Sequence, residues 1–110
     1  MNYLANALSL GMLDCLVDGP VQLECTQISW HAAEAWAGLH IWESIVGHAD
    51  TALLFTSLLG HDVQANRVST SLTPGDNVLV GQYNGPRLPE GAQSLPDGAK
   101  IRWILVEVTS

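Results

Sequence analysis

The chain has 110 residues and a formal net charge of −7, because eleven acidic side chains face only four basic ones. A hydrophobic fraction of 47% at this length predicts one folded domain, residues 1–110, and excludes disordered and fibrous proteins. Four basic side chains cannot form the array that holds a long nucleic acid. A small anionic ligand is still compatible with the composition, since a helix N-terminus and one or two arginines can bind a few phosphates.

The sequence predicts no membrane-spanning segment, no metal site and no cofactor. No apolar run approaches the ~20 residues that cross a bilayer, and the first ten residues lack the basic region of a signal peptide, so we expect a cytoplasmic protein. The two cysteines, Cys15 and Cys25, have no CxxC spacing and are expected to be reduced and partly buried. The four histidines lack metal-ligand spacing, and no phosphate-binding or dinucleotide-binding loop is present.

The N-terminal segment of the chain predicts two strands. Residues 3–8 are mostly apolar and predict a short strand, which a turn and a brief helical segment over residues 9–13 follow. Residues 18–20 (Asp-Gly-Pro) predict a turn. Residues 21–28 alternate between apolar and polar side chains, a pattern typical of a half-buried strand.

The middle of the chain predicts a helix, a strand and a second helix. Ser29 is a suitable N-cap for a helix over residues 30–37, and the glycine that follows is expected to end it. Residues 40–46 predict a strand. A helix of about three turns is predicted between residues 47 and 60, both glycines. Its apolar face is formed by Ala52, Leu53, Phe55, Leu58 and Leu59.

The C-terminal half of the chain predicts three strands and a long loop. Residues 67–72 alternate cleanly and predict a strand, and a Pro-Gly-Asp-Asn turn at residues 74–77 precedes a strand over residues 78–83. Residues 85–98 are rich in proline and glycine and predict a long irregular loop, a kind of segment that is often functional. Residues 101–108 are nearly all apolar, which predicts a central strand covered on both faces.

Together these elements predict an α/β fold, with a mixed sheet of about five to six strands flanked by helices. A purely parallel sheet is not expected, because both tight turns and helices separate the strands. No internal repeat or linker divides the chain, which agrees with one domain.

Several polar residues stand where a strand ends or a helix begins. Such residues often cap turns, complement a helix dipole or form weak surface ion pairs, and their types alone do not decide between these roles and a site. The candidates are Asn6, Ser9, His48, Asp50, Asn66, Arg67, Arg87 and Glu90.

Four segments, taken together, resemble a known family. They read LANALSLGML (residues 4–13), IVGHADTALLFTSLLG (45–60), NRVSTSLTPGD (66–76) and GPRLPEG (85–91). In order and spacing they resemble the viral and prokaryotic anti-CRISPR ring nucleases that act on type III CRISPR signalling. The resemblance extends from residue 3 to residue 91, and residues 15–42 contain none of its motifs.

This resemblance implies a homodimer whose two subunits enclose cyclic tetra-adenylate, the second messenger of type III CRISPR systems. It further implies metal-free cleavage of the ring to linear di-adenylates, which switches off the effectors that the messenger activates. The reaction would take place in the cytoplasm of a prokaryotic cell or of a virus-infected prokaryotic host. His48, Arg87 and Glu90 match the catalytic residues of the family, and Asn6 and Ser9 match its N-terminal ligand contacts.

The chemistry of RNA cleavage is consistent with those residue types. A histidine such as His48 can protonate the departing 5′-oxygen near neutral pH, and Gly47 lets the backbone approach a phosphate. Arg87 would stabilise charge on the phosphorane, and Glu90 would orient one or both partners. Asn66 and Arg67 would contact the ligand, since two copies of each arginine in a twofold dimer can hold a tetranucleotide ring. The loop over residues 85–98 would act as a lid.

The chain departs from the family pattern at three N-terminal positions. Ala5, Leu8 and Gly11 replace a threonine, a phenylalanine and an asparagine, so the ligand contact at Gly11 is altered and a ring of another size is an alternative ligand. Three other functions remain open. The protein would be a sponge that binds the ring without cutting it, a small DNA-binding or partner-binding viral protein, or an unrelated enzyme with Cys15 as nucleophile. The charge of −7 disfavours duplex DNA, and no base stands at a usable spacing from Cys15.

Overall fold

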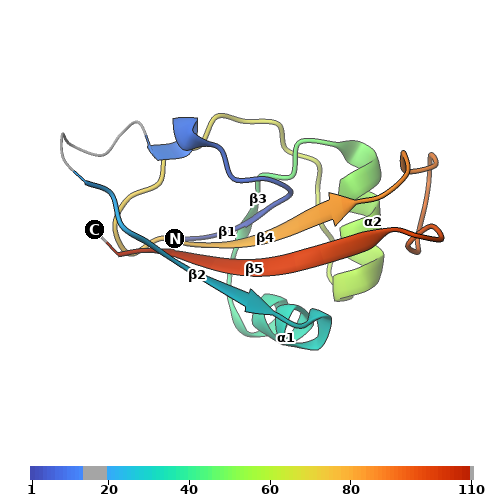
Figure 1. Cartoon of the computed structure of the whole chain (residues 1–110), viewed down its shortest axis with the longest axis horizontal. Coiled ribbons are helices and arrows are strands. Elements are labelled where there is room, and N and C mark those ends of the chain that lie inside the picture. The colour runs from blue at the N-terminus through green and yellow to red at the C-terminus, as the bar shows by residue number, and fades with distance from the viewer. Residues whose placement is uncertain (14–19, 110) are drawn as a thin grey trace.

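Five strands form one mixed sheet in the computed structural model, which describes residues 1–13 and 20–109 (Figure 1). The strands are β1 (Asn2–Ala5), β2 (Leu23–Ile28), β3 (Glu43–Ser44), β4 (Asn77–Asn84) and β5 (Lys100–Val108). Their order across the sheet is β2-β5-β4-β1-β3. β1 runs parallel to both β3 and β4, whereas β5 is antiparallel to β2 and β4, so the predicted α/β mixed sheet is confirmed.

Two helices and one short 3-10 helix accompany the sheet: α1 (Trp30–Leu39), α2 (Ala49–Leu59) and η1 (Leu10–Leu13). The predicted N-cap of α1 is confirmed, because the Ser29 hydroxyl oxygen accepts a hydrogen bond from the backbone N–H of Ala32 at 3.1 Å. The predicted end of this helix at residue 37 is wrong by two residues, since α1 continues through Gly38 to Leu39. Gly60 ends α2 in the left-handed conformation, at φ 72°, as predicted.

The sheet has one face covered by both helices and one face covered only in part. On the helix face, Leu4, Leu79 and Trp103 pack against side chains of α1 and α2, including Trp36 and Phe55. On the opposite face, a second cluster packs beneath η1 and the segment that precedes β4 (Figure 1). Its buried members are Tyr3, Ala5, Ile45, Leu72, Val78, Val80, Val106 and Val108.

The predicted burial of β2 and β5 is only partly correct. β2 lies at the edge of the sheet, and its four central residues are exposed, so Cys25 is a free, exposed thiol rather than a partly buried one. β5 lies between two strands, but Ile104, which packs against the cluster on the second face, is only half-buried. Cys15 and the predicted turn at residues 18–19 lie outside the described residues.

Four predicted strands are shorter than expected or absent. β2 begins at Leu23 instead of residue 21. β1 ends at Ala5 instead of residue 8, and the strand predicted over residues 40–46 shrinks to the two residues of β3. Residues 67–72 form no strand: the segment crosses the second face, where the backbone N–H of Leu72 bonds to the carbonyl of Met12 at 2.7 Å. Within residues 67–72 only the side chain of Leu72 is buried, so the alternating pattern belongs here to an irregular segment packed on the sheet.

On α2, the predicted apolar face is correct except for one residue. Leu54 is fully buried, whereas Leu53 is 39% exposed. The other predicted members, Ala52, Phe55 and Leu59, are buried and Leu58 is partly buried. Within residues 1–13 and 20–109, no helix has the length and apolar character needed to cross a bilayer.

Candidate functional site

His48 stands immediately before α2, with an exposed side chain. Its backbone carbonyl accepts the N–H of Ala52 at 2.9 Å, but its imidazole makes no capping hydrogen bond. The N–H groups in the first turn of a helix have no acceptor within the helix, and an imidazole that does not cap them leaves them open to an anion. Gly47 is held from the other side, because its N–H donates to the Asn6 side-chain oxygen at 3.2 Å.

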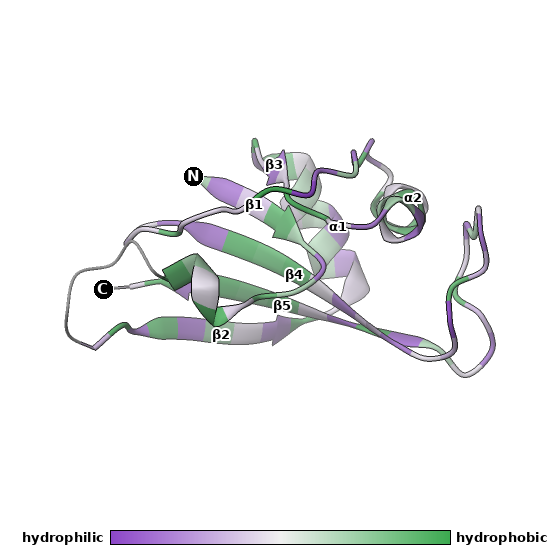
Figure 2. Cartoon of the chain, turned by 90° about the horizontal axis from the view of Figure 1, so that it is seen from above, coloured by the Kyte–Doolittle hydropathy of each residue, from purple (hydrophilic) through white to green (hydrophobic). Residues whose placement is uncertain are grey.

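Residues 85–99 connect β4 to β5 and project beyond the sheet at the end where α2 lies; we call this segment the arm (Figures 1 and 2). At its base, the Tyr83 hydroxyl donates a hydrogen bond to the backbone carbonyl of Pro86 at 2.5 Å. Gly85 packs so closely on the returning chain that a Cβ atom there would lie 2.7 Å from the Cα of Ala99. The base of the arm is therefore tightly built, although most of the arm is exposed.

A hollow of about 440 Å³ lies between the start of α2 and the base of the arm; we call it the arm hollow. The structure thus brings His48 and Arg87, two of the three predicted catalytic residues, to one cavity. The hollow is lined by His48, Asp50, Thr51, Tyr83, Gly85, Pro86, Arg87 and Leu88.

Glu90, the third predicted catalytic residue, lies further along the arm. It lines a second hollow of about 450 Å³, the tip hollow, together with Asp50, Arg87, Leu88 and Pro89. Glu90 therefore shares a cavity with Arg87 but not with His48, whereas Asp50 lines both cavities. The ion pair found among the described residues joins the Met1 amine to Asp76, so the Arg87 guanidinium has no carboxylate within 4.0 Å in this part of the chain.

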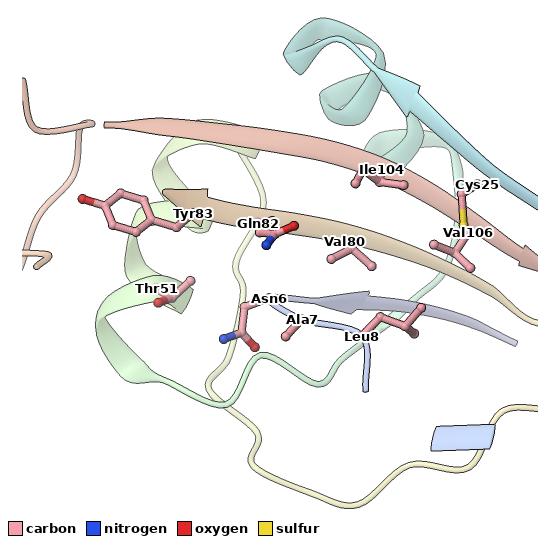
Figure 3. A pocket seen from close by; sticks show the side chains of 10 residues that line it. All are labelled: Asn6, Ala7, Leu8, Cys25, Thr51, Val80, Gln82, Tyr83, Ile104 and Val106. Atoms are coloured by element: carbon pink, nitrogen blue, oxygen red, sulfur yellow. The ribbon is translucent and has the colours of Figure 1, made fainter. Parts of the chain in front are cut away.

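A groove of about 540 Å³ lies on the partly covered face of the sheet; we call it the sheet groove (Figure 3). Apolar side chains from β4 and β5, namely Val80, Ile104 and Val106, form its floor, and polar side chains stand at its rim. Thr51 and Tyr83 line both this groove and the arm hollow, so the two cavities adjoin. An apolar floor beside amide and hydroxyl groups suits a flat heteroaromatic ring with a hydrogen-bonding edge. The rim residues are Asn6, Thr51, Gln82 and Tyr83.

Ser9 and Gly11, two predicted ligand contacts, lie in another hollow of about 400 Å³ beside residues 68–71. They do not share a cavity with His48 in the described chain. Arg67 is exposed and close to Gly47, since its Cγ lies 3.8 Å from the position that a Cβ at Gly47 would occupy. The arginine is thus near the start of α2.

Asn66 has a structural role that its sequence position did not reveal. Its side-chain amide donates to the carbonyl of Ser44 at 2.9 Å, and its backbone N–H donates to the carbonyl of Val46 at 2.8 Å. These two bonds fasten the segment after α2 to the chain at and just after β3. A ligand contact at Asn66 remains a prediction.

Three lining residues escaped the sequence analysis: Thr51, Gln82 and Tyr83. Gln82 and Tyr83 lie near the end of β4, just before the arm. Functional side chains often occur where a strand ends and a loop begins. Thr51 follows His48 by three residues and so lies near it on the first turn of α2. The end of a predicted strand and the first turn of a predicted helix could both have indicated these residues from the sequence.

No group of three or more histidine, cysteine, aspartate or glutamate side chains within residues 1–13 and 20–109 is arranged to hold a metal ion. The candidate site therefore offers an imidazole, a guanidinium, two carboxylates and the open end of a helix. These groups can bind an anion and transfer a proton.

Comparison with known proteins places the whole arrangement in one family. A family model described as STIV B116-like matches residues 2–97, a range that contains every candidate site residue. Among solved structures, B116 of Sulfolobus turreted icosahedral virus (STIV) is similar, with a TM-score of 0.79 and 26% sequence identity. The match covers 96% of this chain and 97% of that chain. No curated protein sequence matches the chain.

Proposed function

We propose that this chain, which belongs to the STIV B116-like family, is a ring nuclease that cleaves cyclic tetra-adenylate to linear di-adenylates without a metal ion. The observation that carries the proposal is the arm hollow, which His48 and Arg87 line together. Both residues also belong to segments that resemble the anti-CRISPR ring nucleases. Cleavage of the messenger would silence the effectors that depend on it.

In the proposed reaction, a ribose 2′-oxygen loses its proton to solvent and attacks the adjacent phosphorus. The bond from phosphorus to the 5′-oxygen breaks, and the protonated imidazole of His48 donates a proton to that leaving oxygen. Each cut produces a 2′,3′-cyclic phosphate and a 5′-hydroxyl. Two cuts on opposite sides of the ring yield two linear di-adenylates.

The charges of the site support a phosphate at the arm hollow. Arg87 has no carboxylate partner within 4.0 Å among the described residues, so its guanidinium is available to the non-bridging oxygens of the reacting phosphate. The open N–H groups in the first turn of α2 lie on the same hollow as His48. Glu90 lines only the tip hollow and forms no ion pair with Arg87 among the described residues, so its orienting role stays a prediction.

A ring with four phosphates requires more cationic groups than one chain offers at this site. A twofold homodimer would supply His48, Arg67 and Arg87 twice, in the symmetry that a cyclic tetranucleotide approximates. The sheet groove, which adjoins the arm hollow, would take an adenine against Val80, Ile104 and Val106. Asp50 and Glu90 beside Arg87 would disfavour long polyanions.

The decisive experiment incubates the protein with cyclic tetra-adenylate in excess EDTA and resolves the products. We expect linear di-adenylates from the wild type and a loss of rate on the order of a hundredfold or more in His48→Ala. His61→Ala is the matched control, since His61 is also exposed but follows the opposite end of α2. Its rate should equal that of the wild type.

Other outcomes separate the alternatives. Tight binding without cleavage, unchanged in His48→Ala, would identify a sponge for the ring. Absence of both binding and cleavage would refute the proposal for this messenger and direct the search to rings of other sizes. Duplex DNA binding that weakens steeply with salt would instead support a DNA-binding protein.

A further inference from the structure

We propose that Tyr83 is a positioning residue, which holds Arg87 against the reacting phosphate; this inference rests on the proposed function. Tyr83 lies near the end of β4, is half-buried, and lines both the sheet groove and the arm hollow (Figure 3). It is therefore situated between the floor of the sheet and the arm that carries Arg87.

The hydrogen bond of Tyr83 acts on the peptide group that leads into Arg87. The Pro86 carbonyl, which accepts the phenol at 2.5 Å, belongs to the planar unit that also contains the Arg87 nitrogen and ends at its Cα. The proline ring additionally restricts the backbone on the other side of this carbonyl. The hydrogen bond to the Pro86 carbonyl oxygen therefore restricts the position of the Arg87 Cα, from which the side chain extends.

The residues around the Tyr83 hydroxyl pack closely against it. A Cβ atom at Gly85 would lie 3.2 Å from that hydroxyl oxygen and 2.7 Å from the Ala99 Cα. The two ends of the arm therefore meet tightly around the phenol, and a larger residue at position 85 would force them apart. An accidental surface contact would not require such a fit.

The need for an anchor follows from the position of Arg87. It is exposed on a projecting arm, and no carboxylate among the described residues holds its guanidinium. A catalytic group displaced by about 1 Å can lose on the order of a hundredfold in rate. A hydrogen bond to the preceding peptide reduces that displacement without using any donor of the guanidinium.

A role for Tyr83 in stacking on an adenine makes a different prediction. Stacking uses the ring face and affects binding, whereas positioning uses the hydroxyl and affects the chemical step. Tyr83→Phe retains the ring and removes only the hydroxyl, so it separates the two roles. Tyr3→Phe is the matched control, because Tyr3 lies in the core beneath the second face, outside the site.

The test is a double-mutant cycle on cleavage of cyclic tetra-adenylate. We expect Tyr83→Phe to lower kcat by about tenfold to a hundredfold with KM changed by less than about twofold. Tyr83→Phe combined with Arg87→Ala should cleave no more slowly than Arg87→Ala alone, because the phenol then has nothing to position. An unchanged kcat, a change confined to KM, or effects that multiply in the double variant would each overturn the inference.

A second measurement keeps the inference testable if the wild type does not cleave the ring, an outcome that refutes the proposed function alone. Nitrogen-15 relaxation reports the order parameter of the Arg87 backbone amide on the ps–ns timescale. We expect a lower order parameter at Arg87 in Tyr83→Phe than in the wild type, with the amides of β4 unchanged. An equal order parameter in both proteins would show that Tyr83 does not anchor this peptide.

Discussion

Replacing Gly81 by alanine tests how closely α2 packs on the sheet. Gly81 is a buried residue of β4 on the helix face, beneath Phe55 of α2 and Trp103 of β5. The two rings pack at a tilt of 52° with centroids 5.1 Å apart. A Cβ atom at residue 81 would lie 2.6 Å from a carbon atom of each ring.

The size of the effect follows from these distances. Carbon atoms pack best at about 3.5–4.0 Å, so each ring must retreat by about 1 Å to accept the methyl group. Both rings are almost fully buried, with 0% of Phe55 and 4% of Trp103 exposed, and neither can move into solvent. Overpacking of this kind costs about 1–3 kcal/mol. For a domain of this size, that corresponds to a fall in Tm of roughly 4–12 °C.

The assay is thermal and urea unfolding of Gly81→Ala, Phe55→Leu and the double variant. Phe55→Leu removes one of the two rings that a Cβ at residue 81 would meet at 2.6 Å, so the double variant should lose less stability than the sum of the two single losses. Gly11→Ala is the control, since the nearest atom to its added Cβ, the Ser9 hydroxyl, is 3.8 Å away. A Tm of Gly81→Ala equal to that of the wild type, or strictly additive losses, would refute the packing argument.

Two further predictions concern stability around β1 and the turn before β4. Burial, and secondarily the negative charges of Asp76 and Glu43, raises the pKa of Tyr3 above its usual value of 10.0. The unfolded tyrosine then ionises first, so this stabilisation is complete below about pH 10 and is lost as pH rises through the folded pKa. Urea midpoints from about pH 8 to 11 should fall less steeply in Tyr3→Phe, and parallel curves would contradict this. Asp76 is buried and accepts the Thr73 backbone N–H at 2.9 Å, so Asp76→Ala should lose about 1–3 kcal/mol in urea unfolding, and a loss below about 0.5 kcal/mol would be inconsistent with that contact.

The helices were predictable from sequence because their signals are local. Ser29 caps α1 through a residue three positions away, and Gly60 ends α2 through its own backbone conformation. The helix that continues past Gly38 shows the limit of such signals. There the backbone N–H of His40 donates to the Trp36 carbonyl at 3.1 Å, so His40 and not Gly38 caps the end of the helix. The position of the glycine did not indicate this.

The strands were less predictable because their partners are distant in sequence. Residues 67–72 alternate as a strand does, but the edge strand β3 is bonded to the segment before them: the Ser44 hydroxyl donates to the Gln64 carbonyl, and the Asn66 amide donates to the Ser44 carbonyl. β2 alternates equally well, yet its edge position leaves Cys25 exposed. Alternation predicts an extended chain with two faces, and only the neighbouring strands decide how much of each face is buried.

The position of the candidate site follows from strand direction, which the sequence did not reveal. β1, β3 and β4 are parallel, so their carboxyl ends meet at the same edge of the sheet. Asn6 follows β1 directly, His48 follows β3 by way of residues 45–47, and Arg87 follows β4. Ligands of open sheets with parallel strands commonly bind outside this edge. The antiparallel β5 contributes Ile104 and Val106 to the floor of the sheet groove, beside Val80 of β4, whereas the residues matched by the family resemblance follow the parallel strands.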